Sequence, residues 1–428
     1  MADAVAEFQK QIGVVNSLNS LNSHFGREWP ILDEAALHGV AGDIVRTLDP
    51  HTEADPVAIL IQLLVFFGNV IGRNAHFKAE SDRHALVEYA VLVGDTSKAR
   101  KGTSQGHVRR LFDSIDQNWS ESCIAAGLSS GEGLVNAVKD PDPEDEHQSS
   151  QPREKRLLIC EGEFASVLRV MVRDGNTLSA TMRNLWDTGN HRNLVKKNPL
   201  KTTGAHVSMI GHITSDELIR YIDRTECANG FANRIRFHCV RRSKLLPEGG
   251  QVDDADMDPL RRRLREAVFS ARSAGEIKRD ELAKMLWHKE YGRISQGRLG
   301  LTGAMLSRAE AHVMRLASLY ALLDQTRLIS LEHLTAALAL WDHCDQSVRF
   351  IFKDSFGDPD ADLILRALQE RGAGLSRTEI SALFHGHKPS EQIEAALSLL
   401  AKSGVAERRE VKTGGRPEER WYLLPTAK

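Results

Sequence analysis

The sequence predicts an α/β fold in which a sheet of buried strands is flanked by helices and followed by a helical block and a small C-terminal domain. Short apolar, β-branched runs alternate with helical periodicity as far as about residue 250. After Pro259 the periodicity is almost purely helical, and near the C-terminus the helices give way to two strands. The predicted divisions are an N-terminal arm at residues 1–28, a core with a helical N-terminal layer at 29–250, a helical lid at 251–356 and a C-terminal domain at 357–428.

Composition narrows the class of protein. The 428 residues carry a formal net charge of −2, which excludes a uniformly basic nucleic-acid binder and leaves only local basic patches for such contacts. The five cysteines form no C-x-x-C pair and no zinc-like spacing, so we interpret them as reduced thiols. The polar N-terminus predicts no signal peptide, and no apolar run is long enough to span a membrane. We therefore expect a cytoplasmic protein without membrane contact.

The N-terminal part is predicted to be helical. Residues Met1 to Arg27 are polar and rich in Asn and Ser, which predicts a loosely attached arm. Asp55 and Pro56 form a typical helix start, because an acidic cap is followed by proline in the first turn. Apolar residues fill most positions of this helix as far as Gly72, so we expect it to be buried on most sides.

The run from Tyr89 to Val93 predicts a buried strand, and a loop of glycine, lysine and small residues separates it from a helix. This order is typical of a P-loop, in which loop amides, a helix N-terminus and a lysine bind phosphates. A Walker A loop reads G-x-x-x-x-G-K-[ST], whereas here Lys101 precedes Gly102 and Thr103. A basic surface loop is the alternative. The candidate nucleotide-binding residues in this loop are Gly94, Lys98, Arg100, Lys101, Gly102, Thr103 and Ser104, with Thr103 also a candidate Mg²⁺ ligand.

A second strand, from Arg156 to Cys160, is followed by two carboxylates, Glu161 and Glu163. Walker B strands end in this way, because one acid holds Mg²⁺ and a neighbouring acid polarises the attacking water. The usual first acid is Asp, so Glu161 departs from the pattern, and Glu163 lies one residue further on than usual. We predict both as catalytic and Glu161 as a metal ligand. A core strand without catalytic duty is the alternative.

Three further segments lie at strand ends. Gly127 to Leu134 is a second glycine loop, which either makes a tight turn or lines a nucleotide or DNA channel. In P-loop motor proteins, a later strand carries the polar group that senses the γ-phosphate, which predicts this role for His212 or Thr214; a lone His there is often only structural. Arg234 lies between a Gly/Asn turn and a strand, a suitable place for an arginine finger that reaches a neighbouring subunit's nucleotide.

Basic residues are interleaved with Trp186 between Arg183 and Lys201, a pattern that binds DNA backbone or stacks a base, although a solvated loop fits equally. The C-terminal domain has the element order of a winged helix, with a Gly-Arg-Pro turn whose arginine suits a minor groove. Docking of a protein is the alternative for this domain. The candidate DNA-binding residues are Arg183, Arg192, Lys196, Lys197, Arg408, Arg409 and Arg416.

In the helical block, Arg308, His312 and Arg315 fall at spacings of four and three, which places them on one helix face. Arg308 is predicted to bind the phosphates of the nucleotide from a helical lid. A charged outer face is the alternative.

These parts, in chain order, resemble an uncharacterised helicase-like P-loop ATPase family, the YfjI type, which is found in phages, plasmids and integrated elements and is often fused to primase modules. The resemblance covers roughly Trp29 to Phe352, and the C-terminal winged helix lies outside it. The stretches that carry it are TEADPVA, GDTSKARKGTS, GLSSGEGL, RLLICEGEFASVLR, NLWDTGN, GAHVSMIGHIT, ELIRYIDRTECANGFANR and RAEAHVMRLASLYALLD.

The resemblance implies a P-loop NTPase core of the RecA/AAA+-like class that binds ATP and Mg²⁺. It implies that Lys101 and Thr103 contact phosphate and metal, that Glu161 and Glu163 are the Walker B acids, and that Arg234 is a finger. The sequence thus predicts an ATP-dependent, helicase-like motor on DNA, a homo-oligomer such as a hexameric ring, with a separate primase or replication partner, in the replication of a mobile element or in defence. A nucleotide-regulated DNA-binding initiator or repressor, and a scaffold without motor activity, stay open as other classes.

Overall fold

The structure is a computed structural model of the chain. It describes residues 28–94, 99–141, 154–194, 199–222, 226–227, 229–298, 300–352, 358–411 and 417–424. The predicted arm at residues 1–28 therefore lies almost wholly outside the described residues. None of the described helices has the length and apolar character needed to cross a lipid bilayer.

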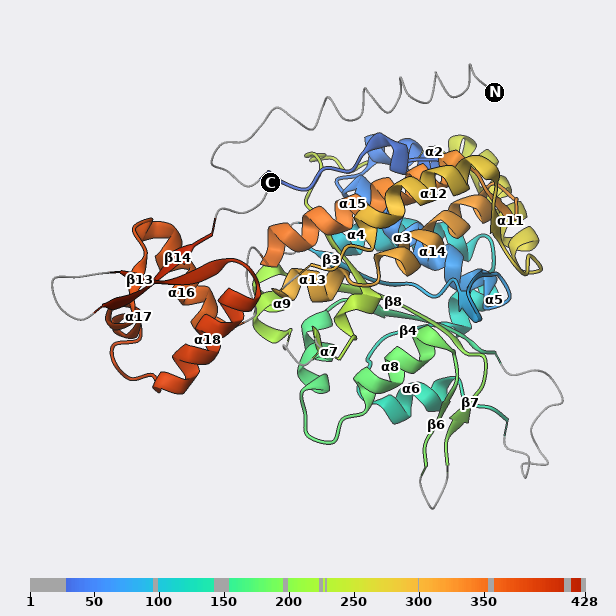
Figure 1. Cartoon of the computed structure of the whole chain (residues 1–428). Coiled ribbons are helices and arrows are strands. Elements are labelled where there is room, and N and C mark those ends of the chain that lie inside the picture. The colour runs from blue at the N-terminus through green and yellow to red at the C-terminus, as the bar shows by residue number, and fades with distance from the viewer. Residues whose placement is uncertain are drawn as a thin grey trace. The chain divides into compact units, whose positions relative to one another are not determined.

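A five-stranded parallel sheet forms the centre of the α/β part, as predicted, with the strand order β4-β5-β8-β3-β9 (Figure 1). Residues in all but the short edge strand β4 are almost completely buried, so β3 and β5 are apolar runs. Strand β9 alternates instead, with Arg236 and His238 buried between its apolar residues. The central strand β3 pairs with β8 on one side and β9 on the other. The strands are β3 (Tyr89–Val93), β4 (Ile124–Ala125), β5 (Arg156–Glu161), β8 (His206–Ile213) and β9 (Ile235–Cys239).

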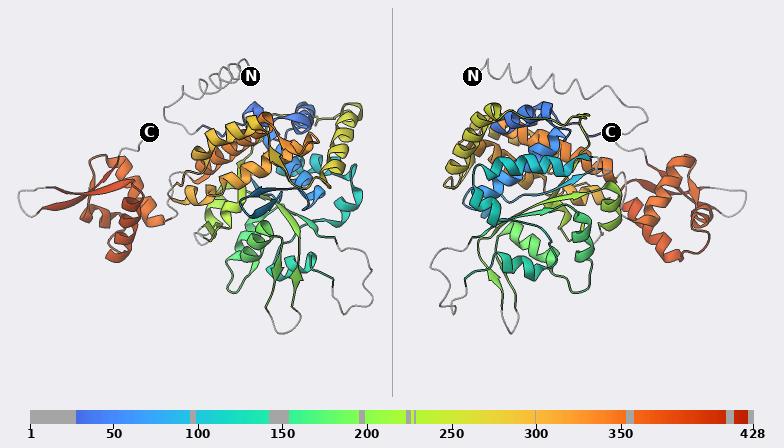
Figure 2. Two further views of the ribbon diagram at one scale, coloured as in Figure 1. Left: turned by 45° about the vertical axis from the view of Figure 1, so that its right-hand side comes forward. Right: turned by 180° about the vertical axis from the view of Figure 1, so that it is seen from behind.

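Helices cover both faces of this sheet, as Figures 1 and 2 show. The chain crosses from β3 to β4 over one face, and returns through β5, β8 and β9 over the other, as right-handed crossovers require. The first face carries α3 (Pro56–Ile71), α4 (Lys101–Asp113) and α5 (Gln117–Ser122), and the second carries α6 (Gly131–Ala137), α7 (Phe164–Met171), α8 (Leu178–Asp187) and α9 (Ser215–Tyr221).

Helix α3 begins as predicted, with the Asp55 carboxylate accepting a hydrogen bond from the backbone N–H of Val57 and with proline at its first position. It ends at Gly72, which has a φ of +78°. Every residue from Val57 to Ile71 is buried, because α3 lies between the sheet and the helices α2, α11 and α14. Its buried amide, Asn69, donates to the carbonyls of strands β5 and β8 and accepts from Trp119, so this polar side chain costs little inside the core.

The predicted helical block shares its core with the N-terminal helices. Helix α15 packs on strand β9, and α14 packs on α2, α3 and α15. The block consists of α11 (Asp254–Ala271), α12 (Glu281–Ile294), α13 (Gly300–Leu306), α14 (Ala309–Leu323) and α15 (Leu331–Phe352), and the N-terminal layer adds η1 (Glu34–Ala36), α2 (Gly39–Leu48) and η2 (Asp49–His51). The remaining short elements are η4 (Ala232–Arg234), the hairpin β1 (His76–Ala79) with β2 (Asp82–Ala85), the hairpin β6 (His191–Arg192) with β7 (Lys201–Thr202), and the parallel pair β10 (Lys278–Arg279) with β11 (Leu328–Ile329).

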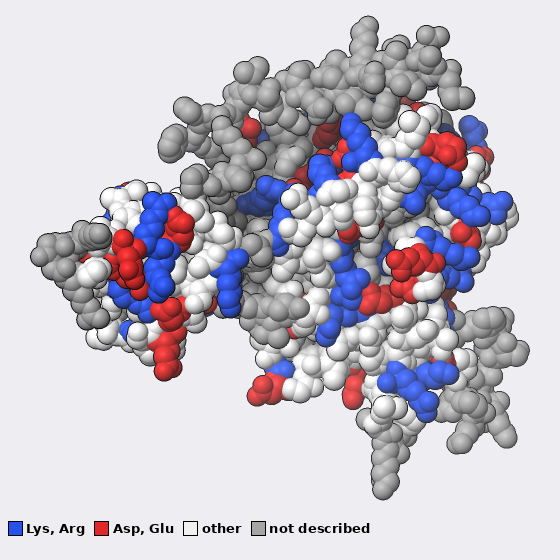
Figure 3. All heavy atoms as spheres, viewed as in Figure 1, with Lys and Arg blue, Asp and Glu red and all other residues white. Residues whose placement is uncertain are grey.

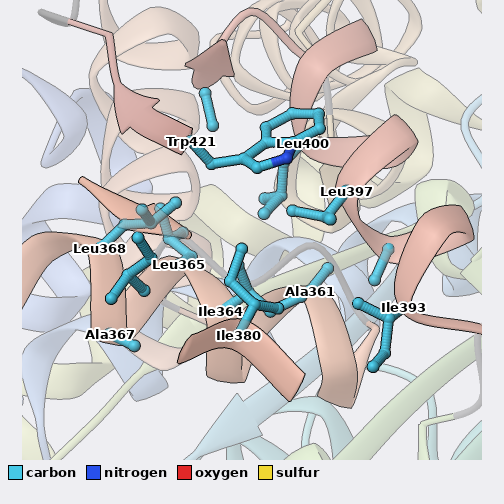
Figure 4. Close-up of a cluster of buried hydrophobic side chains, with 13 residues drawn as sticks. Ala361, Ile364, Leu365, Ala367, Leu368, Ile380, Ile393, Leu397, Leu400 and Trp421 are labelled. Carbon is cyan, nitrogen blue, oxygen red and sulfur yellow. The ribbon is translucent and has the colours of Figure 1, made fainter. Parts of the chain in front are cut away.

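The C-terminal domain has three helices and a three-stranded antiparallel sheet of order β12-β14-β13. It has its own hydrophobic core, in which Trp421 packs beside Leu397 and Leu400 (Figure 4). A capping box starts α17: the Ser376 hydroxyl accepts from the backbone N–H of Glu379, whose side chain accepts from the backbone N–H of Ser376. The elements are α16 (Pro359–Arg371), β12 (Leu375–Ser376), α17 (Arg377–Leu383), α18 (Ser390–Lys402), β13 (Ala406–Val411) and β14 (Glu418–Leu423).

Candidate functional site

The carboxyl ends of β3 and β8 form the switch point of the sheet. These two strands are neighbours, but the chain leaves β3 toward α4 on one face and leaves β8 toward α9 on the other. In open α/β sheets, ligands bind in the crevice that such diverging connections leave at the carboxyl ends of the strands. Residues at this point are therefore the first candidates for a binding site.

Lys101 lies at this switch point. It is the first residue of α4, and its Nζ donates to the carbonyl oxygen of Gly94 (2.9 Å), after β3, and to that of Ile213 (3.1 Å), at the end of β8. Gly94 has no room for a side chain, because a Cβ there would lie 2.6 Å from the carbonyl oxygen of Val240. The glycine thus lets the loop return close to the sheet, and the ammonium group joins the two strand ends.

His212 faces Lys101 from the end of β8. It pairs with Leu92 of β3, is 5% exposed, and its Nε2 has no hydrogen-bond partner among the described residues. Burial and the nearby Lys101 ammonium lower the pKa of His212 to about 4, so the ring is neutral at physiological pH. Thr214, the other candidate on this strand, is engaged in a capping box with Glu217 at the start of α9. His212 is thus the strand-end group with a free polar atom.

Glu161 is the last residue of β5, on the far side of β8 from β3. It is 7% exposed, and its Oε1 accepts a hydrogen bond from the backbone N–H of Leu128 at 2.6 Å. Leu128 belongs to the second glycine loop, which also lines an apolar cavity of about 200 Å³ beneath α6. Glu163 is exposed instead, at the start of α7, and its backbone carbonyl rather than its carboxylate accepts from Ser166. Only Glu161 of the two thus lies at a strand end within the sheet.

The other predicted loop residues have different environments. Ser104 is fully buried. Inside the core its hydroxyl donates to the carbonyl of Lys101 (2.7 Å) and accepts from the side chain of Gln62 (2.6 Å). Its hydroxyl is thus engaged inside the fold rather than directed at a ligand. Arg100 has a φ of +54°, and its guanidinium pairs with Glu53 at 2.6 Å. Gly102 and Thr103 are exposed on the first turn of α4, and Lys98 lies outside the described residues.

Arg234 and Arg308 come together, but at the opposite end of the sheet from Lys101. Arg234 directly precedes β9, whose first residue pairs with Tyr89 at the start of β3. Its Nη2 and Nε donate to the two carboxylate oxygens of Asp187 at 2.6 and 3.2 Å, and Arg308 lies 3.6 Å from the same carboxylate. The expectation that Arg308 binds the nucleotide held by Lys101 of the same chain therefore needs correction, because the sheet separates the two residues.

The alternative interpretation, in which Arg308, His312 and Arg315 form a charged outer face, fails for two of the three residues. His312 and Arg315 are 1% and 0% exposed, and the Arg315 guanidinium stacks on Trp186 at 3.4 Å from the ring centroid. Trp186 is itself 1% exposed, so it cannot stack a nucleobase in this arrangement, which corrects that expectation. Arg183 donates to the backbone carbonyl of Asn229 at 2.8 Å, which gives it a structural role.

The remaining DNA-binding candidates that the structure describes lie on two hairpins. Arg192 is exposed on the β6–β7 hairpin, directly opposite Lys201, whereas Lys196 and Lys197 lie outside the described residues. In the C-terminal domain, Arg408 and Arg409 pair with Glu419 and Glu407, and Arg416 also lies outside the described residues. Figure 3 shows acidic and basic side chains intermixed over the face in view, as expected from the nearly zero net charge.

A cluster of His38, Asp324 and His333 was not predicted, because 286 residues separate its first two members in sequence. Both histidines approach Asp324 Oδ2 through Nε2, at 2.9 and 3.1 Å. A metal-binding histidine donates with its other ring nitrogen, but here the backbone N–H of Ser330 donates to Nδ1 of His333 at 3.0 Å. Because Nδ1 of His333 accepts this bond, neutral His333 carries its proton on Nε2 and donates it to Asp324. The three side chains thus form a hydrogen-bonded cluster rather than a metal centre.

The chain matches no protein-family model, and no curated protein is significantly similar to it.

Proposed function

We propose that the chain is a P-loop ATPase that works as a helicase-like motor on DNA, with its nucleotide held at the switch point between β3 and β8. The observation that carries the proposal is the convergence of Lys101 and His212 there. The start of α4, which has 13 residues, supplies backbone N–H groups at the positive end of a helix dipole. An ammonium, a neutral imidazole with an unpartnered nitrogen and a helix N-terminus together suit a polyphosphate.

The strand order supports the same proposal. Strand β8 lies between β3 and β5. Its carboxyl end therefore lies between Lys101, which contacts the end of β3, and Glu161, which ends β5. A group that senses the terminal phosphate belongs in this position, and His212 occupies it. Because His212 is neutral at physiological pH, it can donate a hydrogen bond to a phosphate oxygen without adding charge.

The acidic residues fit a hydrolytic role. Mg²⁺, when bound, neutralises charge that develops on the phosphates. Glu161 would hold it or orient the attacking water, since one oxygen of its carboxylate is fixed by Leu128 and the other is left for a ligand or proton. Lys101 would have to leave its two carbonyl acceptors to bind the phosphates, and Thr103 would supply a hydroxyl from the first turn of α4. Glu163, which is exposed at the start of α7, would have a secondary part in orienting the attacking water.

A ring of subunits would bring Arg234 to this chemistry. Since Arg234 lies at the amino ends of the strands, it meets a nucleotide only when the nucleotide belongs to a neighbouring copy. DNA would contact the exposed β6–β7 hairpin through Arg192, Lys196 and Lys197, and the C-terminal winged helix through Arg408, Arg409 and Arg416. A replication partner such as a primase would act in a separate chain.

The test is ATP hydrolysis with and without single-stranded and duplex DNA, measured for the wild type, Lys101→Ala, Glu161→Gln and Glu163→Gln. We expect DNA-stimulated turnover that Lys101→Ala and Glu161→Gln lower by about 10²-fold or more, because phosphoryl transfer depends on positioning and charge neutralisation. Glu163→Gln is the control for removal of a nearby carboxylate, exposed at the start of α7, and we expect a smaller loss. Wild-type turnover by Lys101→Ala protein would refute the proposed site.

One observation favours a second function, a nucleotide-regulated initiator or scaffold that binds ATP without turnover. Thr103 follows Lys101 by two residues, which is about 200° around a helix, whereas the Walker A hydroxyl follows by one residue, about 100°. Nucleotide binding that changes duplex DNA binding or assembly, without hydrolysis, would support this function.

A further inference from the structure

The arginines at the amino ends of the strands outnumber their acidic partners. Among the described residues, the carboxylates that pair with them are Asp187, which serves Arg234 and Arg308, and Glu88, which serves Arg236. The other two guanidinium groups donate to backbone carbonyls instead. We define the arginine cluster as Arg73, Arg234, Arg236, Arg308 and Arg315.

This excess of positive charge is buried and therefore costly. Arg236 and Arg315 are completely buried and Arg234 is 6% exposed. Burial lowers the pKa of Arg315 to about 9 and that of Arg73 to about 10. Buried charges are normally paired one to one, because an unpaired charge loses its hydration without compensation. The cluster is thus short of negative charge by more than one unit.

The open side of the cluster is formed by Asp187 and Arg308. Their side chains are 34% and 36% exposed, whereas that of Arg234 is 7% exposed. The guanidinium groups of Arg234 and Arg308 both lie over the ring of Trp186, at 5.5 and 5.4 Å from its centroid. The indole and Asp187 thus hold two planar, five-donor groups in place, with Arg308 open to solvent and Arg234 buried behind it.

We propose that Asp187 is a latch on a phosphate-binding site made by Arg234 and Arg308, and that a phosphate group of a nucleotide bound to a second copy of this chain displaces its carboxylate. Two converging guanidinium groups match the oxygens of a phosphate, and a phosphate of higher charge competes well against one carboxylate. The source of the phosphate follows from the sheet: Tyr89–Val93 of β3 spans about 13 Å, so a nucleotide at Lys101 of the same chain cannot reach.

This inference rests on the proposed function for the source of the phosphate, but its recognition is tested without it. In a Lys101→Ala background, which lacks the lysine of the switch point, tripolyphosphate binding is measured by calorimetry at constant ionic strength. We expect Asp187→Asn to tighten binding about two- to fivefold, since an ion pair of this exposure competes with roughly that strength. Adding Arg308→Gln should remove the gain. No gain, or a gain that survives Arg308→Gln, would overturn the latch.

A matched control is Asp342→Asn, which removes the partner of Arg293 at 2.9 Å in an ion pair of similar exposure elsewhere on the chain. It should leave tripolyphosphate binding unchanged. If Asp187→Asn protein fails to fold, Arg308→Gln alone in the Lys101→Ala background decides: weaker tripolyphosphate binding supports the site, and equal binding refutes it.

The source of the phosphate is tested with Lys101 intact. Sedimentation in ATP should show that Asp187→Asn lowers the protein concentration needed for assembly by a similar factor. Unchanged assembly together with tighter tripolyphosphate binding would refute a second copy as the source and assign the site to a free phosphate compound. Failure of ATP binding at Lys101 would refute the proposed function while the calorimetric result on the latch stands.

Discussion

At the scale of single residues, His212 links the candidate site to acid sensitivity. Its pKa is about 4 in the folded chain and 6.5 when unfolded, so between these values the unfolded state binds a proton that the folded state does not. The contribution of this group to stability is therefore lost as the pH falls from 6.5 toward 4, by about 2 kcal/mol at pH 5.

The corresponding prediction is that His212→Gln protein loses less stability than the wild type between pH 7 and pH 5. Urea unfolding at the two pH values measures the difference. His38 is the control of opposite sign, because its hydrogen bond to Asp324 raises its pKa, so its contribution is greatest below pH 6.5 and declines at higher pH. Equal pH dependence of wild type and His212→Gln would show that the ring is not buried as described.

Gly94 and Gly102 differ in the space available for a side chain, which gives a second prediction at this scale. Gly94→Ala should destabilise the fold by about 1–3 kcal/mol, because the new methyl group meets the fixed carbonyl of Val240. Gly102→Ala has nothing within 4 Å of its Cβ and should leave stability unchanged or raise it, by up to about 1 kcal/mol, since alanine favours a helix. Thermal unfolding of both variants checks the contrast, and similar losses would contradict the described loop.

At the scale of elements, patterns that depend on neighbouring residues were predictable. The Asp55-Pro56 start of α3 and the capping box at Ser376 are read from three or four adjacent residues, and the structure has both. The buried strands β3 and β5 are apolar runs, and the parallel pairing of the sheet follows from the helices between its strands. What sequence cannot supply is which distant side chains meet. The meeting of Arg234 and Arg308 on Asp187 brings together η4, the start of α14 and the end of α8, and no local pattern encodes that contact.

The same limit explains the errors on α14. The spacing of Arg308, His312 and Arg315 correctly places them near one another on a helix, but spacing does not say which side of a helix faces solvent. Charged residues usually mark the outer face, and here the inner position of Arg315 is made tolerable by Trp186 and backbone carbonyls. Burial of charge is thus the feature that sequence reasoning missed.

At the scale of the whole molecule, the C-terminal domain is predicted to fold without the rest of the chain, because its core is formed within residues 361–421. A fragment of residues 358–428 should show near-ultraviolet circular dichroism and a cooperative melt. Trp421→Ala should abolish both, since removing a buried tryptophan costs about 3–5 kcal/mol, much of the stability of so small a domain. Leu423→Ala, at a side chain that is 41% exposed, is the control and should still fold.

The burial of α3 has a consequence for how the chain is made. This helix has no exposed face, and its surroundings include α14, which the ribosome completes about 250 residues later. At roughly 5–20 residues per second, an apolar segment of sixteen residues waits on the order of 12–50 s for its partner. During synthesis the apolar α3 segment is therefore exposed to solvent until α14 has been made. Production of this protein should depend on chaperones and on expression at low temperature.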